Sequence, residues 1–401
     1  MSNKTADFLV VGGGVIGLNL ALWARRTFPD CHTILIDKEA DCGLHASGRN
    51  SGVLHAGFYY TADSLKSRFT RDGNHVMAEY CKERGLRLNQ CGKLVVAKDE
   101  SELAGLDELL RRARVNNVEL HEISAREALE IEPSVRTHER CLYSPATASV
   151  DPSEVMQSFI RDARDAGVEI RVGCEYRGHK GDRVRVGDDL ITARYVINAA
   201  GLYADRVARD YGFSEDYRIV PFKGLYLYGN DTAIKVRTNI YPVPDLNNPF
   251  LGVHLTVTAH GKVKLGPTAI PAFWREHYKG VENFVFNEMV EILFRELGLF
   301  ASNSFGFRRL AVQELMKYSR RRLVRLASSL VSGIDHSQFT TWGPAGIRAQ
   351  LVNTRKNSLE MDFRYEGDER SFHILNAVSP AFTCAIPFTK FLFDKIEKLV
   401  A

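Results

Sequence analysis

The hydrophobic and polar positions of the chain follow a strand-like and then a helix-like period from the start. The apolar run Phe8–Val11 leads into a glycine turn and a helix-like stretch, and a second apolar run follows at Thr33–Ile36. Two short buried strands with a helix between them are typical of a β-α-β unit. We therefore expect residues 8–40 to open an α/β domain.

Further along the chain, segments with the hydrophobic spacing of helices alternate with segments typical of strands. Helices are predicted over residues 64–84, 100–116, 124–131 and 153–166, and strands over residues 93–97, 169–172, 184–186, 191–193 and 195–201. Residues 217–270 alternate apolar and polar positions between Pro and Gly breaks. Residues 284–332 are helical in period, and a final amphipathic helix is expected at 385–400.

The length of 401 residues favours two domains, because it is long for one hydrophobic core. We expect an α/β fold in which a Rossmann-like nucleotide-binding domain is intertwined with a β-rich α+β substrate domain. The nucleotide-binding domain is assigned residues 1–85, 146–215 and 343–401. The substrate domain is assigned residues 86–145 and 216–342.

Composition and charge are those of an ordinary globular protein, with 45% hydrophobic and 25% charged residues. Lys and Arg exceed Asp and Glu by 53 − 49 = 4, which predicts no nucleic-acid partner but suits a small anionic substrate. The seven cysteines are scattered without a Cys-x-x-Cys pair. We therefore expect free thiols in a reducing compartment and no metal site.

The N-terminal segment lacks the pattern of a signal or transit peptide, because the first strand begins by Phe8. No apolar run approaches the roughly twenty residues needed to cross a bilayer. We therefore expect a soluble, cytoplasmic protein. The basic amphipathic stretch Lys317–Leu330 could be a solvated helix face or lie on an anionic membrane, so peripheral membrane contact stays open.

The first glycine turn carries the pattern Gly12-x-Gly14-x-x-Gly17 between a strand and a helix, and Asp37 ends the next strand. Gly12 permits the tight turn, Gly14 lets the backbone approach a pyrophosphate, and Gly17 lets the helix pack on the strand. The helix N-terminus then offers N–H groups to phosphates. Asp37 can accept hydrogen bonds from a ribose. The motif predicts a bound dinucleotide but leaves nicotinamide and flavin both open.

Three further segments favour a flavin. The loop Gly48–Gly52 can lay N–H groups along a ribityl–pyrophosphate chain, and the small residues of Asn198–Gly201 allow a planar cofactor to approach. The turn Ala377–Ala381 leads into the final helix, whose positive N-terminal end would stabilise a reduced flavin. We therefore predict FAD. The residues expected to contact it are Gly12, Gly14, Gly17, Asp37, Lys38, Ser47, Asn50, Ser51, Gly52, Ala200, Gly201, Ser379 and Pro380.

Several long segments make the chain similar to a known superfamily. They are Asn50–Tyr60, Gln90–Leu94, Ile219–Gly224, Asn239–Asp245, Pro249–His254, Leu265–Pro267 and Gly343–Gln350. On these segments the chain resembles the FAD-dependent D-amino-acid-oxidase superfamily of glycine-oxidase and sarcosine-oxidase type, and within it the L-2-hydroxyglutarate oxidases and dehydrogenases. The resemblance implies oxidation of L-2-hydroxyglutarate, or a similar short 2-hydroxy acid, with electrons passing to oxygen or a quinone-linked acceptor.

The implied reaction needs a base for the hydroxyl proton and cations for the carboxylates. His55 and His254 are the candidate catalytic residues, because imidazole titrates near working pH. Tyr241, Arg348 and Lys223 are the candidate substrate-binding residues, and Arg348 suits bidentate carboxylate binding. For each the alternative is structural: a satisfied histidine, a core aromatic ring, an ion pair or a solvated lysine.

Two departures from the family pattern keep other functions open. Phe382 stands where the family tends to have a small residue, and Pro387 lies inside the expected final helix. Both would suit a flavoprotein without turnover that serves as a binding partner. An amino-acid or secondary-amine oxidase on the same fold is the other alternative, and it could use Arg348 equally well.

Overall fold

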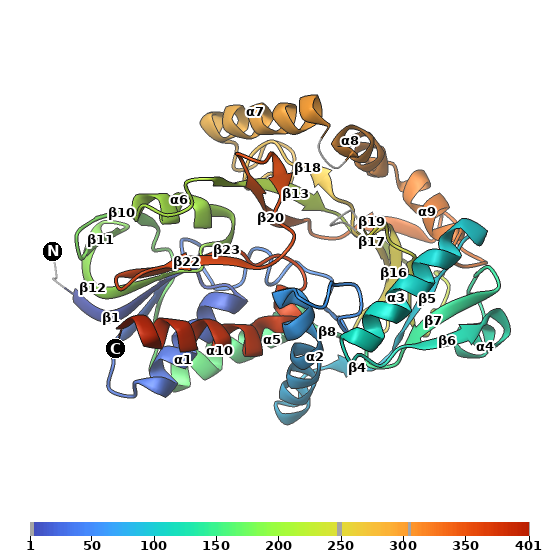
Figure 1. Cartoon of the computed structure of the whole chain (residues 1–401), viewed down its shortest axis with the longest axis horizontal. Coiled ribbons are helices and arrows are strands. Elements are labelled where there is room, and N and C mark those ends of the chain that lie inside the picture. The colour runs from blue at the N-terminus through green and yellow to red at the C-terminus, as the bar shows by residue number, and fades with distance from the viewer. Residues whose placement is uncertain (1–3, 247–250, 304–305, 401) are drawn as a thin grey trace. The chain divides into compact units, whose positions relative to one another are not determined.

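The chain passes repeatedly between two units in the computed structural model, which describes residues 4–246, 251–303 and 306–400. Unit 1 consists of Met1–Asn50, Pro152–Val220 and Arg348–Ala401, and unit 2 of Ser51–Asp151 and Pro221–Ile347. Figure 1 shows the elements of both. Residues 51–85, which the sequence analysis assigned to the first domain, cluster with unit 2. The reason is strand pairing, because β3 (Val53–Leu54) and β4 (Leu88–Asn89) both pair with β8 (Ala148–Val150).

Unit 1 is built on a parallel sheet with β1 at its centre. β1 (Lys4–Val11) pairs in parallel with β12 (Asp189–Asn198) on one side and β2 (Thr33–Ile36) on the other. β9 (Glu169–Arg171) extends the sheet beyond β2, and β23 (Ser371–Asn376) pairs in parallel with β12. The edge strands β10 (Tyr176–Lys180), β11 (Arg183–Val186) and β22 (Arg364–Gly367) are antiparallel to their neighbours.

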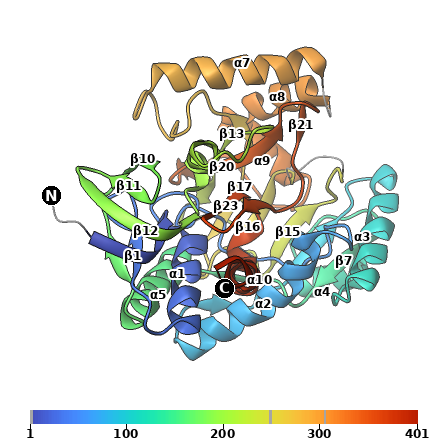
Figure 2. The ribbon, with the colours of Figure 1, turned by 60° about the vertical axis from the view of Figure 1, so that its left-hand side comes forward.

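Helices cover this sheet. α1 (Val15–Thr27) is buried along most of its length and packs against α5 (Pro152–Asp165) and α10 (Ala381–Val400), and two views show the three helices together (Figure 1, Figure 2). The short helices η2 (Gly201–Tyr203) and α6 (Ala204–Asp210) follow β12. Apolar side chains of β1, β2 and β12 form the core of the unit.

Unit 2 contains an eight-stranded sheet in the order β19-β14-β17-β16-β15-β5-β7-β6. Its strands are β5 (Lys93–Val96), β6 (His121–Ser124), β7 (Arg140–Ser144), β14 (Leu227–Gly229), β15 (Asn239–Pro242), β16 (His254–Val257), β17 (Val263–Gly266) and β19 (Phe339–Trp342). Neighbouring strands are antiparallel except β15 and β5, which are parallel. β5 and β15 are separated by 142 residues of sequence (239 − 96 − 1), so their pairing is a long-range contact.

The helices of unit 2 lie in three stretches of the chain. They are α2 (Leu65–Glu83), η1 (Glu100–Glu102), α3 (Leu103–Val115), α4 (Ala125–Ile131), α7 (Phe286–Ser302), α8 (Phe307–Leu315), η4 (Met316–Tyr318) and α9 (Arg320–Ser328). α4 begins with a capping box in which Ser124 and Glu127 satisfy each other's backbone N–H groups. β13 (Tyr217–Gly224) and β20 (Gly346–Asn353) each contain residues of both units, and β18 (Ile270–Pro271) and β21 (Ser358–Leu359) pair with them.

Most of the predicted elements are confirmed, and the differences have simple causes. The strands expected at 191–193 and 195–201 are one strand, β12, because its first half pairs with β11 and its second half with β23. The final helix begins at Ala381 rather than 385 and continues through Pro387. Among the described residues, no helix combines the length and the apolar character that spanning a membrane requires.

Candidate active site

The glycine turn after β1 has the close contacts that its motif predicts. Gly12 has φ +109°, and a Cβ atom there would lie 2.4 Å from the carbonyl oxygen of Ala199. A Cβ atom on Gly17 would lie 1.9 Å from the carbonyl oxygen of Gly12. Gly12 therefore makes the turn and Gly17 allows α1 to pack on it, since no other residue type fits either place.

Two polar side chains hold this turn. Asp37, at the end of β2, accepts hydrogen bonds from the N–H of Gly13 (2.7 Å) and from the N–H of Glu39 (2.9 Å). Ser47 accepts one from the N–H of Val15, the first residue of α1 (2.9 Å). The first turn of α1 carries no acidic side chain. A helix N-terminus of this kind, free of negative charge, fits a pyrophosphate.

The predicted cofactor segments gather at one edge of the sheet of unit 1. Val11 pairs with Asn198 and Ile36, and Asn198 pairs with His373. Because these strands are parallel, their carboxyl ends carry the glycine turn, Asp37, the Ala200–Gly201 turn and the Ser379–Pro380 turn on the same side. β2 lies on one side of β1 and β12 on the other, so later strands of the sheet are added on both sides of β1. Ligands of open α/β sheets bind at such a switch point.

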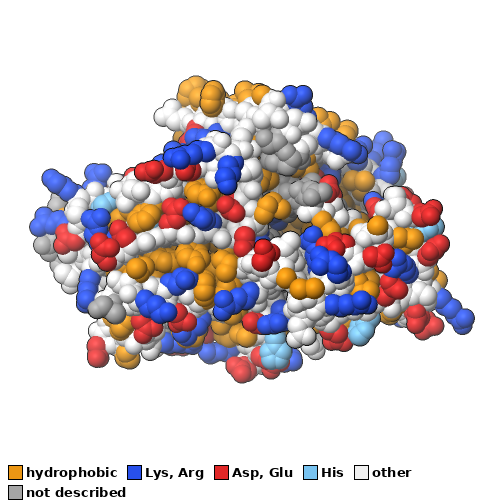
Figure 3. Space-filling view, viewed as in Figure 1, with side chains coloured by type: hydrophobic (Ala, Val, Ile, Leu, Met, Phe, Trp, Pro, Cys, Tyr) orange, Lys and Arg blue, Asp and Glu red, His pale blue; other side chains and the backbone are white. Residues whose placement is uncertain are grey.

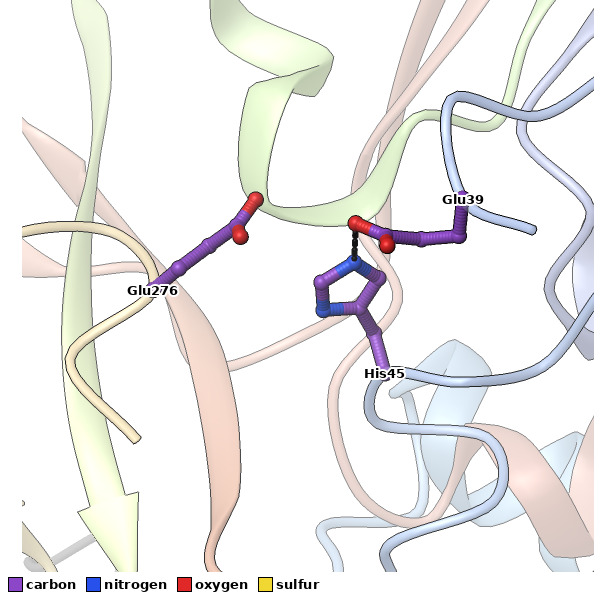
Figure 4. A group of neighbouring side chains, drawn as sticks. All are labelled: Glu39, His45 and Glu276. Carbon is purple, nitrogen blue, oxygen red and sulfur yellow. Dashed lines mark hydrogen bonds and ion pairs between the residues drawn. The ribbon is translucent and has the colours of Figure 1, made fainter. Parts of the chain in front are cut away.

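Lys38 and Asn50 make local contacts in this region. Lys38 forms an ion pair with Glu39 and lies 5.6 Å from the ring centre of Tyr203. Figure 4 shows Glu39 also bonded to His45, whose Nε2 lies 2.9 Å from the carboxylate; Glu276, drawn there too, belongs to unit 2. Asn50 donates to the carbonyl oxygen of Ser47 (2.6 Å) and so closes a turn in the loop between β2 and β3.

The remaining predicted cofactor residues lie at chain turns. Gly52 (φ +74°) accepts a hydrogen bond from the N–H of Val150, and Ser51 accepts one from the N–H of Val53. Ala200 donates to the side chain of Asn198 (3.1 Å). Gly201 has φ +53° and open space where a Cβ would stand. Ser51 and Gly52 belong to unit 2, whereas the other predicted cofactor residues belong to unit 1.

The central strands of the large sheet of unit 2 carry apolar side chains on one side and several polar side chains on the other, and both sides are buried there. Leu94, Ile240, Leu255 and Leu265 belong to the apolar core on one side. The register places the alternate residues of the same strands on the other side, which we call the polar face. Its buried polar members are Lys93, Asn239, Tyr241, His254, Thr256 and Lys264, and the buried Val95 lies on the same side opposite Tyr241.

His254 and Tyr241 meet on the polar face. Their rings stack with centres 3.6 Å apart at an angle of 16°. The Nδ1 atom of His254 lies 2.8 Å from the carbonyl oxygen of Gly252. Because a carbonyl only accepts, Nδ1 carries the hydrogen, and in the neutral ring Nε2 carries the lone pair. Burial lowers the pKa of His254 to about 3, the hydrogen bond to Gly252 opposes this, and nearby lysines lower the pKa further.

Lys93 lies beside this pair in an aromatic cage. Its Nζ atom is 4.3 Å from the ring centre of Tyr241, 5.1 Å from that of Tyr59 and 5.5 Å from that of Phe58. The side chain is fully buried. Nζ has no hydrogen-bond partner in the part of the chain that the structure describes. Burial lowers the pKa of Lys93 to about 7.

Lys264 and Lys223 are further buried lysines of unit 2. Lys264, opposite Thr256 on the polar face, has its Nζ 4.5 Å from the ring centre of Tyr226. Burial lowers its pKa to about 8. Lys223, on β13, is also buried, and burial lowers its pKa to about 8. The solvated surface position considered for Lys223 is therefore wrong, because its side chain is only 4% exposed.

His55 and Arg348 do not lie on the strands that form the polar face. His55 is buried directly after β3, and Phe58 and Tyr59 of the Lys93 cage follow it in sequence. Arg348 is half-buried on β20, at the point where the chain enters unit 1 for the last time. The structure thus brings Tyr241 and His254 into direct contact, while Arg348 belongs to the other unit.

Lys93 and Lys264 are candidate functional residues that the sequence analysis missed. Lys93 lies inside the segment Gln90–Leu94, which was noted only for its resemblance, and Lys264 directly precedes Leu265–Pro267. A lysine within an otherwise apolar strand is the available signal, because Lys is almost never fully buried without a reason. That both face the same side follows only from the pairing of strands distant in sequence.

Comparisons with known proteins agree on the type of protein. The family described as FAD dependent oxidoreductase, abbreviated DAO, matches residues 7–386. The L-2-hydroxyglutarate dehydrogenase of Escherichia coli strain K12 is 34% identical over 98% of this chain and 94% of its own length. The mitochondrial L-2-hydroxyglutarate dehydrogenase of Homo sapiens is 34% identical over 99% of this chain and 90% of its own length.

Solved structures share the fold. L-alpha-glycerophosphate oxidase from Mycoplasma pneumoniae, solved with FAD bound, has a TM-score of 0.79 and 20% identity, and the match covers 98% of this chain and 95% of that one. Glycine oxidase from Geobacillus kaustophilus has a TM-score of 0.72 and 18% identity, covering 100% and 96%. The predicted fold class is thereby confirmed.

Proposed function

We propose a substrate for this chain on the basis that it belongs to the DAO family of FAD-dependent oxidoreductases. The proposed reaction is the oxidation of L-2-hydroxyglutarate, or a similar short 2-hydroxy acid, to the 2-oxo acid. Relatives that are named L-2-hydroxyglutarate dehydrogenase and match almost the whole chain support this substrate. The observation that carries the proposal is the polar face, where two buried ammonium groups lie near a neutral imidazole. A dianion with one hydroxyl group suits that set of groups.

FAD is the cofactor, as the family requires. The close contacts at Gly12 and Gly17, the acid-free start of α1 and the shared sheet edge fit its ADP half. We assign the cofactor contacts to the residues named from the sequence, with Asp37 toward the ribose and Ser47 beside the pyrophosphate. When bound, FAD accepts the hydride that leaves C2 of the substrate.

The residues of the polar face then have separate tasks. Nε2 of His254 accepts the hydroxyl proton, while the hydrogen bond from Nδ1 to Gly252 fixes the ring. Lys93 and Lys264 attract the two carboxylates, whose negative charge opposes the lowering of the His254 pKa that burial, and to a smaller extent these cations, cause. The hydroxyl group of Tyr241 and the side chains of His55, Lys223 and Arg348 are further proposed contacts to the substrate.

An anaerobic titration of the purified holoprotein tests the substrate. We expect the flavin absorption to bleach with L-2-hydroxyglutarate but not with its D-isomer, glycine or sarcosine. Bleaching by glycine or sarcosine alone would instead identify an amine oxidase. A flavin that none of the four compounds bleaches would favour the non-catalytic alternative, to which Phe382 and Pro387 point.

The electron acceptor is tested by the second half of the same experiment. We propose oxygen or a quinone-linked acceptor, the latter with peripheral contact to a membrane. After anaerobic reduction, the flavin is mixed either with air-saturated buffer or with a soluble quinone. Fast recovery of the absorption in air indicates an oxidase, and recovery only with quinone indicates a dehydrogenase.

A further inference from the structure

α7 of unit 2 has its polar and apolar sides reversed relative to an ordinary surface helix. Phe286, Val290, Phe294 and Leu297 recur at intervals of four, four and three residues, so they share one side of the helix. All four are exposed, and Phe294 retains 78% of its accessible surface. The opposite side buries the carboxylates of Glu288 and Glu296 together with Ile292 and Leu299.

The two buried glutamates of α7 are the clearest sign that its polar side faces the protein interior. Burial raises the pKa of Glu296 to about 8, and Glu288 accepts a hydrogen bond from the N–H of Arg275 (3.1 Å). Rotating α7 to bury its phenylalanines would bring both carboxylates to the surface, yet the fold keeps the reverse arrangement. An exposed apolar stripe of this size, rimmed by polar groups, marks an interaction surface.

The helices that follow α7 expose further apolar side chains. Val312, Leu315, Met316 and Tyr318, in α8 and η4, are exposed as well. Figure 3 shows hydrophobic side chains gathered over the position of α7 in Figure 1. We call the exposed side of α7, α8, η4 and α9 the α7–α9 surface.

The charge of the α7–α9 surface is positive. Between residues 286 and 330, every exposed charged side chain that the structure describes is an arginine: Arg308, Arg309, Arg320, Arg321 and Arg325. Of the four acids in the same stretch, Glu288, Glu296 and Glu314 are buried, and the partly exposed Glu291 is ion-paired with Arg295. Exposed apolar side chains together with surface cations are the combination that binds an anionic lipid bilayer.

α9 supplies little of the apolar part. Lys317–Leu330 was expected to be either a solvated helix face or a membrane-facing amphipathic stretch, but Leu323, Val324 and Leu330 are buried, and the last two pack in the core beneath the large sheet. Besides its arginines, α9 exposes Leu326, which retains 37% of its accessible surface. Most exposed apolar side chains of this surface therefore belong to α7, α8 and η4, which the period of the sequence did not reveal.

We propose that the α7–α9 surface docks on an anionic lipid bilayer, with the phenylalanines of α7 entering the headgroup region and the arginines contacting lipid phosphates. A second copy of the chain fits this surface less well, because a two-fold contact would bring the same arginines face to face. The proposal does not depend on the substrate, since none of these side chains belongs to the polar face.

Vesicle flotation of the full-length holoprotein tests the docking surface. We expect the protein to float with vesicles of phosphatidylcholine and phosphatidylglycerol, to bind pure phosphatidylcholine weakly, and to dissociate as salt is raised. The double variant Phe294→Asp, Leu297→Asp should lower the partition by about tenfold or more. The matched control is Val115→Asp, an exposed apolar residue at the end of α3, which should bind as the unaltered protein does.

A second pair of variants tests the proposed contact between the arginines and the lipid phosphates. Arg309→Glu with Arg321→Glu should weaken binding to the anionic vesicles at low salt and have little effect at high salt. The control Arg126→Glu changes an exposed arginine on α4 by the same charge. Unchanged flavin absorption in every variant shows that the fold is retained, and Phe286→Ser with Val290→Ser repeats the apolar test with smaller changes.

Three results would overturn the proposal. The first is that the unaltered protein does not float with anionic vesicles. The second is that the Phe294→Asp, Leu297→Asp variant floats as well as the Val115→Asp control. The third is a dimer in light scattering that this variant converts to monomers, which would assign the surface to a second copy. Each result is independent of whether L-2-hydroxyglutarate is the substrate.

Discussion

At the scale of single residues, the polar face depends on lysines that the fold holds away from water. A buried ammonium group is costly unless a charge or a hydrogen bond compensates it. Lys93 is fully buried, and its nearest described groups are aromatic rings, which favour a cation but do not replace a carboxylate. We therefore expect its charge to be coupled to the binding of the anionic substrate.

This coupling predicts a pH dependence of KM. The pKa of Lys93 is lowered to about 7, so the free enzyme loses this charge as the pH rises through 7. A carboxylate binds the protonated form, and KM should therefore rise above pH 7, by up to about tenfold per pH unit. The measurement is the pH profile of KM from roughly pH 6 to pH 9, a range that includes this pKa.

Variants of Lys93 separate substrate binding from structure. Lys93→Met removes the charge and should raise KM by about 30-fold or more, corresponding to a loss of at least about 2 kcal/mol. Lys93→Arg keeps a charge that does not titrate, so the rise of KM near pH 7 should disappear. A later rise should remain as Lys264, whose pKa is lowered to about 8 by burial, loses its charge. A Lys93→Met variant with unchanged KM and an unchanged pH profile would remove Lys93 from the site.

At the scale of elements, the sequence revealed local features and missed long-range ones. The glycine turn, Asp37 and the first helix could be predicted because their signals lie within about forty contiguous residues. The polar face could not, since Lys93 joins Tyr241 and His254 only through the parallel pairing of β5 with β15. Periodicity identified the helices around 284–332 but could not tell which side of α7 is buried, because its buried side carries acids.

The close contact between α1 and the glycine turn leads us to expect a large effect from adding a single methyl group at Gly17. Gly17→Ala would place a Cβ atom 1.9 Å from the carbonyl oxygen of Gly12, so either α1 or the turn must move. Displacement of the turn changes the N–H groups offered to the pyrophosphate, and we expect most of the bound FAD to be lost. The ratio of flavin to protein absorbance measures this loss.

The matched control for this substitution is Gly298→Ala on α7. Gly298 is also helical, but open space surrounds the position where its Cβ would stand. This variant should keep its full FAD content, because an alanine in a helix interior is tolerated or mildly stabilising. Equal flavin content in the two variants would show that the close contact at Gly17 is not needed for FAD binding.

At the scale of the whole molecule, the cofactor residues of unit 1 come from three segments of the chain. The segments are Met1–Asn50, Pro152–Val220 and Arg348–Ala401, and the sheet joins them through β2, β1, β12 and β23. FAD bound as we propose, at the carboxyl ends of these strands, would contact residues from all three. A ligand that binds only the assembled unit stabilises it by mass action.

Removal of FAD should therefore lower the thermal stability of the protein. At a free FAD concentration of about 100 times Kd, binding contributes about 2.7 kcal/mol, which corresponds to a rise in Tm of about 3 °C for a protein of this length. Thermal scans of the apoprotein, with and without added FAD, measure the shift. Gly298→Ala should show the same shift as the unaltered protein, whereas Gly17→Ala should show little or none. A Gly17→Ala protein that FAD stabilises fully would contradict the placement of the cofactor at the glycine turn.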